Sequence, residues 1–174
     1  MRTVKSWTWT CLVAAALLFS AGAAFAEDIS GLISSTRTIR EDSRLVGDVT
    51  CTVTGAPCIQ FGSPHIELRL NGFTMTGRAD ASTGCSGART GNEHGISSNG
   101  QTDVIVRGPG IVQRFRAVGI FFAGTLLGRV TGITSTTNCQ SGIQVNPTSS
   151  QITLESNVAV RNGTTDPGAA CGGI

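Results

Sequence analysis

The dipeptide Gly-Ile occurs four times in the second half of this chain, at an almost regular spacing. The four copies begin at Gly95, Gly119, Gly142 and Gly173. The first three are 24 and 23 residues apart, and each leads into a short run of small, polar and β-branched residues. A fixed period of this size is typical of one structural unit stacked on copies of itself. The repeat therefore constrains the architecture strongly and the activity only weakly.

Short apolar alternations, broken by Gly, Asn and Pro, make up most of the chain around these repeats. A period of two with β-branched residues predicts strands, which we expect at residues 49–53, 66–70, 104–106, 119–121 and 152–154. No sustained apolar face with a 3.6-residue period follows residue 26, so few helices are expected. Units this small cannot bury their own apolar faces, but units stacked about 4.8 Å apart form parallel sheets around a shared core.

The first 26 residues have the three parts of a cleaved signal peptide. Arg2 and Lys5 supply a positive region, residues 11–19 an apolar stretch, and Ala24-Phe25-Ala26 a small-x-small cleavage pattern. The apolar stretch is shorter than the ~20 residues that a membrane-spanning helix needs. The sequence therefore predicts a secreted, periplasmic or cell-surface protein without a membrane span after cleavage.

Removal of this leader leaves a chain without formal net charge. Eleven acidic residues and eleven arginines follow position 26, and the single lysine is lost with the leader. Nucleic-acid-binding proteins usually carry an excess of basic residues, and this chain has no such excess after the leader, so no nucleic-acid partner is expected. The remaining length suits one domain. We expect residues 27–46 to lead into the fold as an N-terminal capping segment and residues 47–174 to form one repeat domain.

Five cysteines follow the leader, and disulfides are their usual state in an exported chain. Cys51 and Cys58 flank a short segment with Gly and Pro, and they form the first predicted disulfide. Cys139 and Cys171 each precede a Gly-Ile copy, so stacking brings them to neighbouring levels as the second predicted pair. Cys85 is left over or pairs with one of these. No CxxC or paired CxxC/HxxxH spacing supports a zinc site.

Three sequence runs, together with the repeated Gly-Ile, carry a resemblance to a known superfamily. The runs are LNGFTMTG (residues 70–77), VIVRGPGIVQRF (104–115) and SNVAVRNG (156–163). They resemble right-handed parallel β-helix repeats of the pectate-lyase-like superfamily and of exported bacterial β-helix proteins. The resemblance covers residues 47–174 and implies an all-β, right-handed parallel β-helix. Because the superfamily includes lyases, glycoside hydrolases, esterases, adhesins, phage tailspikes and accessory proteins, it implies no single activity.

The last Gly-Ile copy bears on how far the repeats extend. Gly173-Ile174 opens a further unit at the point where the sequence stops. Solenoids normally carry a polar terminal cap that prevents an exposed, self-pairing edge, and none is recognisable here. We therefore expect a β-helix that is truncated at its C-terminus.

Outward positions on the predicted strands supply the candidate catalytic residues. The predicted register places Glu67 beside Asp103 on the next level. A second outward column holds Asn71, Arg107, Thr131 and Glu155. Two carboxylates about 5 Å apart could bind Ca²⁺ or act as acid and nucleophile on a glycosidic bond, with Arg107 facing a sugar carboxylate. The ordinary interpretation is a set of solvated charges on a sheet face, and no other metal or cofactor is expected.

Histidine and aromatic residues give weaker signals. Glu93-His94 ends a Gly-rich insertion and is expected in a surface loop, with a general base as the less favoured alternative. No Trp or Tyr follows residue 26, although sugar-binding sites commonly use aromatic rings as contact surfaces. Alternation places one residue of Phe121-Phe122 inside, and Phe73 and Phe115 are expected in the core.

Together these observations predict an exported β-helix scaffold or surface interaction module without identifiable catalytic machinery. Its expected partner is a polysaccharide or another cell-surface component. The alternative is a polysaccharide lyase or glycoside hydrolase whose cleft continues in further C-terminal coils, with Glu67, Asp103 and Arg107 at one end. An accessory protein that handles a metal is disfavoured by the few His and Met residues. No nucleophile elbow or phosphate-binding loop is recognisable.

Overall fold

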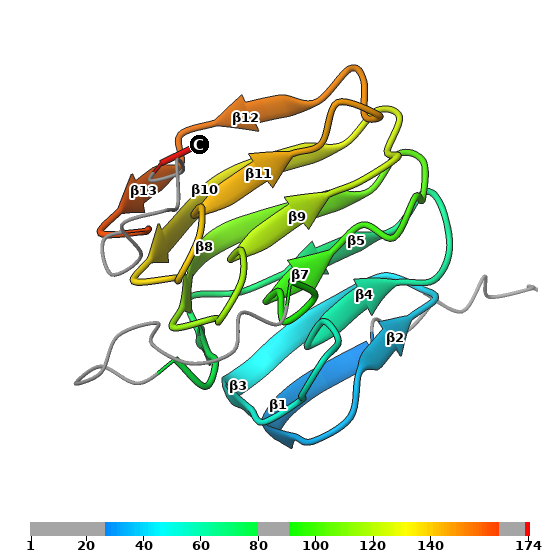
Figure 1. The fold of residues 1–174 in the computed structure, drawn as a ribbon. Helices are drawn as coiled ribbons and strands as arrows, with labels where there is room; N and C mark the ends of the chain where they lie inside the picture. The colour runs from blue at the N-terminus through cyan, green and yellow to red at the C-terminus, as the bar shows by residue number, and fades with distance from the viewer. Residues whose placement is uncertain (1–26, 80–90, 164–172) are drawn as a thin grey trace, which may run out of the picture.

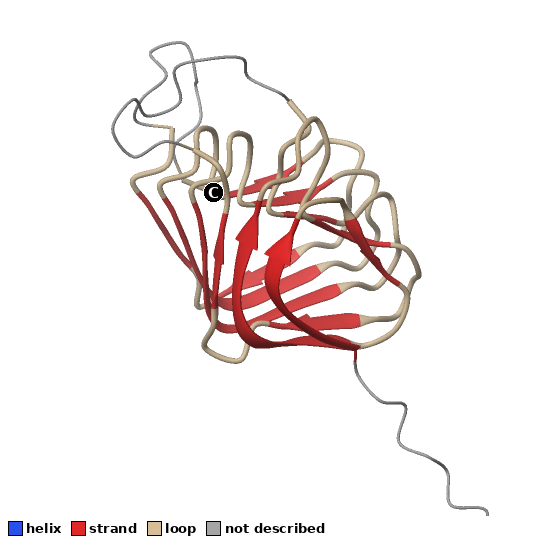
Figure 2. Ribbon diagram, turned by 90° about the horizontal axis from the view of Figure 1, so that it is seen from below, coloured by secondary structure: helices blue, strands red, loops and turns tan. Residues whose placement is uncertain are grey.

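The described part of the chain consists of strands and loops. The computed structural model describes residues 27–79, 91–163 and 173–174, and within them the fold is all-β, without helices (Figure 2). Its strands form two parallel sheets (Figure 1). No helix long and apolar enough to cross a membrane occurs in these described ranges. An all-β fold of parallel sheets is compatible with a β-helix.

The two sheets contain eight and five strands. The larger sheet consists of β1 (Glu27–Ile33), β3 (Ser43–Cys51), β5 (Glu67–Arg69), β6 (Thr74–Thr76), β8 (Ile105–Gln113), β10 (Arg129–Thr136), β12 (Thr153–Glu155) and β13 (Val158–Val160). The smaller sheet consists of β2 (Arg37–Ile39), β4 (Ile59–Phe61), β7 (Ile96–Ser97), β9 (Ile120–Phe122) and β11 (Ile143–Val145). Each strand predicted from the alternation overlaps one of these, so those predictions are confirmed.

The chain passes alternately through the two sheets, and we call one passage through both a level. A long strand such as β8 pairs along its length with two short strands, β5 and β6, of the level before it. The levels stack in chain order from β1 to β12 (Figure 1). Residues 27–46, expected as a capping segment, form β1, β2 and the start of β3, so they already belong to the stack. The boundary expected after residue 46 falls inside β3.

From β7 onward, the repeated Gly-Ile marks where successive levels enter the five-stranded sheet. Ile96, Ile120 and Ile143 pair in register, and each is at most 1% exposed. The N–H of each isoleucine donates to the carbonyl of the repeat glycine one level further on, at 2.9, 3.0 and 3.4 Å in chain order. The acceptor for Ile143 is Gly173, so the fourth copy continues the same stack. The period seen in the sequence is therefore a stacking register.

Close approach between levels, and not backbone conformation, requires glycine at these repeat positions. A Cβ on Gly119 would lie 2.6 Å from the carbonyl oxygen of Gly142, and one on Gly95 would lie 2.5 Å from that of Gly119. None of these three glycines has a positive φ. Non-glycine residues such as Asp103 and Leu127 adopt the left-handed conformation at corners instead.

One apolar cluster fills the space between the sheets. Alternation along each strand turns one set of side chains inward, and sets from successive levels stack on one another. In the larger sheet the fully buried, in-register set includes Leu68, Val106 and Val130. Phe122 is buried and Phe121 is half-buried, as the alternation predicts. Phe115 is also buried and Phe73 packs against the cluster, which confirms both core predictions.

Near one corner of the stack, the side chains of two buried asparagines accept hydrogen bonds from backbone N–H groups. Asn138 and Asn162 are 2% and 3% exposed. The Oδ1 atom of Asn138 accepts the Phe115 N–H at 2.9 Å, and that of Asn162 accepts the Asn138 N–H at 3.0 Å. Asn162 Nδ2 donates to the Ser135 carbonyl at 2.9 Å. Because buried polar groups require partners, this ladder couples three successive levels.

The predicted disulfide between Cys51 and Cys58 is confirmed, with Cα atoms 6.0 Å apart. It closes the loop between β3 and β4 at both of its ends. Cys139 is buried and also disulfide-bonded. Cys171, its predicted partner, and Cys85 lie outside the described residues, so the second pairing stays a prediction.

The glycine column gives a first prediction. Gly119→Ala places a Cβ against the Gly142 carbonyl, and we expect a loss of about 1–3 kcal/mol in the free energy of unfolding. Gly91→Ala is the control, because a Cβ there meets nothing within 4 Å and the backbone φ is not positive. Urea denaturation of both variants, followed by circular dichroism, measures the difference. Equal midpoints for the two variants would contradict the close-approach argument.

The disulfide gives a second prediction. Non-reducing peptide mapping of the oxidised protein is expected to recover Cys51 and Cys58 in one linked fragment. Cys58→Ser is expected to lower the free energy of unfolding by about 2–3 kcal/mol, because the unfolded chain regains the entropy of a short closed loop. Adding reductant to the wild type should reproduce at least this loss. A Cys58→Ser variant as stable as the oxidised wild type would contradict a stabilising role.

Candidate functional site

The structure separates the two carboxylates that the sequence places side by side. Glu67 in β5 pairs with Ile105 of β8, two residues beyond Asp103, so the predicted adjacency is wrong. The predicted register matches Asn71 with Arg107, whereas the strands place Arg69 opposite Arg107, a difference of two residues. A shift of two residues preserves the alternation, so Glu67 still faces outward while its neighbour changes.

Glu67 lies between two arginines. Its carboxylate accepts a hydrogen bond from Arg69 Nη2 at 3.1 Å and forms an ion pair with Arg107 Nε. Burial, the largest single influence, raises the pKa of Glu67, but the hydrogen bonds from Arg107 and Arg69 more than offset it. The pKa therefore lies below its usual value. A carboxylate held ionised in this way is a poor general acid.

The outward column beside Glu67 carries three arginines on successive levels, with a carboxylate at each end of the column. In register it contains Asp28, Arg44, Arg69, Arg107, Thr131 and Glu155. The predicted membership of Arg107, Thr131 and Glu155 is confirmed, whereas Arg69 occupies the place predicted for Asn71. Arg44 donates to Asp28 at 2.7 Å. Opposite charges on an exposed sheet face compensate one another at little net energy, which matches the ordinary interpretation of this surface.

Asp103 lies at the corner before β8 and contacts a histidine instead of Glu67. Its Oδ2 atom is 3.0 Å from His65 Nδ1, and both side chains are largely exposed. The Ca²⁺ site predicted from Glu67 and Asp103 therefore lacks its second carboxylate. Across the described ranges of the chain, no cluster of three or more His, Cys, Asp or Glu side chains could hold a metal ion.

A second candidate site is an open groove of about 490 Å³ over the outer face of the five-stranded sheet. Its floor includes the outward side chains Gln60, Ser97 and Phe121, which pair in register on β4, β7 and β9. The remaining lining residues are Gly55, Ala56, Pro57, Asn92, His94, Asn99, Gly100 and Ala123. Among the residues that the structure describes, no Asp, Glu, Lys or Arg side chain lines the groove.

Glu93 and His94 lie beside this groove in a position that the sequence does not predict. They are 4% and 5% exposed, so the expectation that they belong to a surface loop is wrong. Glu93 Oε1 accepts the Gly55 N–H at 3.0 Å, and its Oε2 lies 3.6 Å from Arg116 Nη1. Glu93 therefore acts as a buried anchor between the loop before β4 and the segment before β9.

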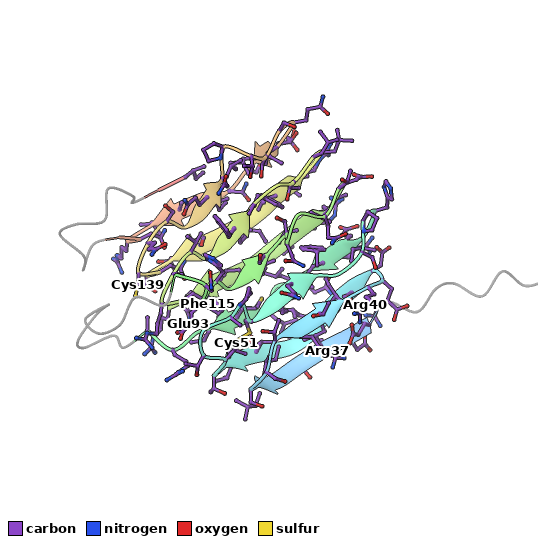
Figure 3. All side chains as sticks on the ribbon, turned by 45° about the vertical axis from the view of Figure 1, so that its right-hand side comes forward. Arg37, Arg40, Cys51, Glu93, Phe115 and Cys139 are labelled. Carbon is purple, nitrogen blue, oxygen red and sulfur yellow. A yellow bond between two sulfur atoms is a disulfide. The ribbon has the colours of Figure 1, made fainter. Side chains whose placement is uncertain are left out.

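The loop at residues 52–57 forms part of the groove lining and is held at three points. The disulfide fixes both ends, and Glu93 holds the middle through Gly55. Figure 3 shows Cys51, Glu93 and Phe115 on the same side of the molecule, away from Arg37 and Arg40. These contacts position the loop before any ligand binds.

The His94 ring packs flat on Phe121, with ring centroids 4.3 Å apart and an interplanar angle of 18°. The Val118 N–H donates to His94 Nδ1 at 3.3 Å, so the hydrogen of the neutral ring is on Nε2. Burial lowers the pKa of His94 to about 4. His94 is therefore neutral near pH 7, and its Nε2–H is a hydrogen-bond donor.

Two polar groups of the groove lining have no protein partner. Ser97 is 7% exposed, and its hydroxyl makes no hydrogen bond within the described residues. The Nε2–H of His94 likewise has no acceptor there. Polar groups at this degree of burial normally have hydrogen-bond partners, so both groups can bond to water or to a ligand in the groove. Sequence reasoning missed this site, although Gln60, Ser97 and Phe121 already follow one uncharged outward column.

Comparison with known proteins adds no identification. No protein-family model, curated protein or solved structure matches this chain.

The buried histidine predicts a pH dependence of stability. As the pH falls below about 6.5 the unfolded chain protonates His94, whereas the folded protein does so only near pH 4. Because the unfolded state binds the extra proton in this window, the free energy of unfolding falls as the pH falls, by up to about 3 kcal/mol. Above this pH window, the contribution of His94 to the free energy of unfolding is constant.

Urea denaturation at pH 7 and pH 4.5 measures this loss. His94→Asn, which keeps a hydrogen-bond acceptor but does not titrate, is expected to remove this component of the acid sensitivity. His65→Asn is the control, because His65 is exposed. If His94→Asn loses as much stability on acidification as the wild type, burial of a neutral His94 is not the cause.

Proposed function

We propose that the protein is an exported, right-handed parallel β-helix that serves as a non-catalytic scaffold or surface interaction module with polysaccharide as its ligand. The observation that carries the proposal is the set of outward columns, in which side chains recur in register at every level of both sheets. A surface with a regular repeat suits a polymer with a regular repeat. The resemblance to exported β-helix repeats supports the same conclusion, and the confirmed disulfide fits an oxidising compartment.

The geometry around the predicted catalytic residues favours binding over turnover. Glycoside hydrolysis requires two carboxylates in defined roles, one of them protonated. Glu67 is held ionised by Arg69 and Arg107, and Asp103 lies at a corner against His65. An enzyme would therefore need catalytic groups other than these. A lyase or hydrolase is the competing outcome of the experiment below.

A panel of soluble and insoluble polysaccharides tests the proposal. We expect the secreted protein to be retained by at least one polysaccharide in pull-down and affinity electrophoresis. Prolonged incubation, followed by chromatography for new reducing or unsaturated ends, is expected to show no products. Products from the wild type that disappear with a correctly folded Asp103→Ala or Glu67→Gln variant would establish the enzyme instead. Failure to bind any polysaccharide in the panel would overturn the proposed ligand class.

A further inference from the structure

We infer that the groove over the five-stranded sheet binds a segment of a neutral glycan, an inference that rests on the proposed polysaccharide-binding function. The site consists of Gln60, Ser97 and Phe121 on three successive levels, with His94 beside them. Its volume of about 490 Å³ falls within the range of small-molecule binding sites. It lies on a different sheet from Glu67, Arg69 and Arg107.

The charge of the lining selects the ligand class. The in-register outward column of the five-stranded sheet contains Thr38, Gln60, Ser97, Phe121 and Gln144, none of which is charged. The titratable group in the lining, His94, is neutral near pH 7. Glu93 lies behind the lining and is paired with Arg116. A uronic or sulfated glycan would lose hydration in this groove without gaining a cation, whereas a neutral sugar chain carries no such cost.

The polar groups of the groove match the hydroxyls of a sugar. The Ser97 hydroxyl and the His94 Nε2–H have no partner within the described residues. The side-chain amides of Gln60, Asn92 and Asn99 add both donors and acceptors to the lining. Sugar hydroxyls donate and accept, so they can satisfy all of these groups at once. The half-buried ring of Phe121 offers an apolar surface for the C–H groups of a sugar ring.

The backbone of the site disfavours an extended peptide as the ligand. Peptides that add to a sheet pair with an exposed edge through main-chain hydrogen bonds. β7 lies between β4 and β9 and is paired with both, so its backbone groups face neighbouring strands. The groove therefore offers only side chains of the sheet face to a ligand.

The loop at residues 52–57 keeps the site formed in the absence of ligand. It is closed by the disulfide and held in its middle by Glu93. A lining that is already ordered reduces the entropy lost on binding. This explains why an anionic side chain is buried beside an uncharged groove without taking part in its surface.

Isothermal titration calorimetry with oligosaccharides tests the inference. The probes are neutral gluco-, manno- and xylo-oligosaccharides and, as the charged counterpart, oligogalacturonates of equal length. We expect binding of at least one neutral series and at least tenfold weaker binding of the oligogalacturonates. Gln60→Ala and Ser97→Ala are each expected to weaken neutral-glycan binding about three- to tenfold, the effect of removing one hydrogen-bonding group.

Gln113→Ala is the matched control. Gln113 and Gln60 are both half-buried, and each donates from Nε2 to a threonine Oγ1 one level away at 3.1 Å. Only Gln60 lines the groove, so Gln113→Ala is expected to leave affinity unchanged. Melting curves of all variants exclude unfolding as the cause of a lost signal.

The outcomes separate the two proposals. If glycans bind but Gln60→Ala and Ser97→Ala have no more effect than Gln113→Ala, the assignment to this groove is overturned and the proposed function stands. Stronger binding of oligogalacturonates than of neutral oligosaccharides also overturns the inference. If no polysaccharide or oligosaccharide binds the folded wild type, the proposed function fails and the site assignment fails with it.

Discussion

The contact between repeat glycines of successive levels sets how closely the levels approach from β7 onward. The Ile96 N–H donates to the Gly119 carbonyl, and the same bond recurs from Ile120 to Gly142. A Cβ on Gly119 would meet the carbonyl oxygen of Gly142 at 2.6 Å, so only glycine permits the levels to approach this closely. Once this column is in register, alternation turns the isoleucines inward and the next residues outward. Both the core and the floor of the groove therefore depend on it.

The two sheets use their outer faces differently. On the larger sheet, outward arginines pair with nearby carboxylates and compensate their charge, as in the contacts of Glu67 with Arg69 and Arg107. On the smaller sheet the outward column is uncharged, and its one aromatic side chain, Phe121, lies against His94. Paired charges keep the first face soluble but leave little to attract a ligand. The uncharged face retains hydrogen-bonding groups, such as the Ser97 hydroxyl, that have no partner within the described residues.

Buried polar side chains connect the irregular parts of the chain to the regular stack. Glu93 holds the loop before β4 through Gly55, and His94 accepts the Val118 N–H while packing on Phe121. Asn138 has the same function at another corner, where its side chain replaces a backbone partner of Phe115. Each of these groups is costly to bury without its partners, so each specifies one arrangement of the segment that it holds.

The sequence by itself determined the features that repeat from level to level. The Gly-Ile period predicts the stacking, the alternation predicts which side of each strand faces the core, and the spacing of Cys51 and Cys58 predicts their disulfide. These features are local or recur at a fixed interval, so one chain shows them without its fold. Only the tertiary structure decided that Glu67 lies beside Ile105 and not Asp103, and that Glu93 and His94 are buried. The pairing of strands on successive levels sets the first, and contacts between residues far apart in the sequence set the second. A periodic pattern encodes neither the strand register nor the burial of Glu93 and His94. A two-residue shift leaves the alternation unchanged, and the insertion that ends at Glu93 and His94 has no period.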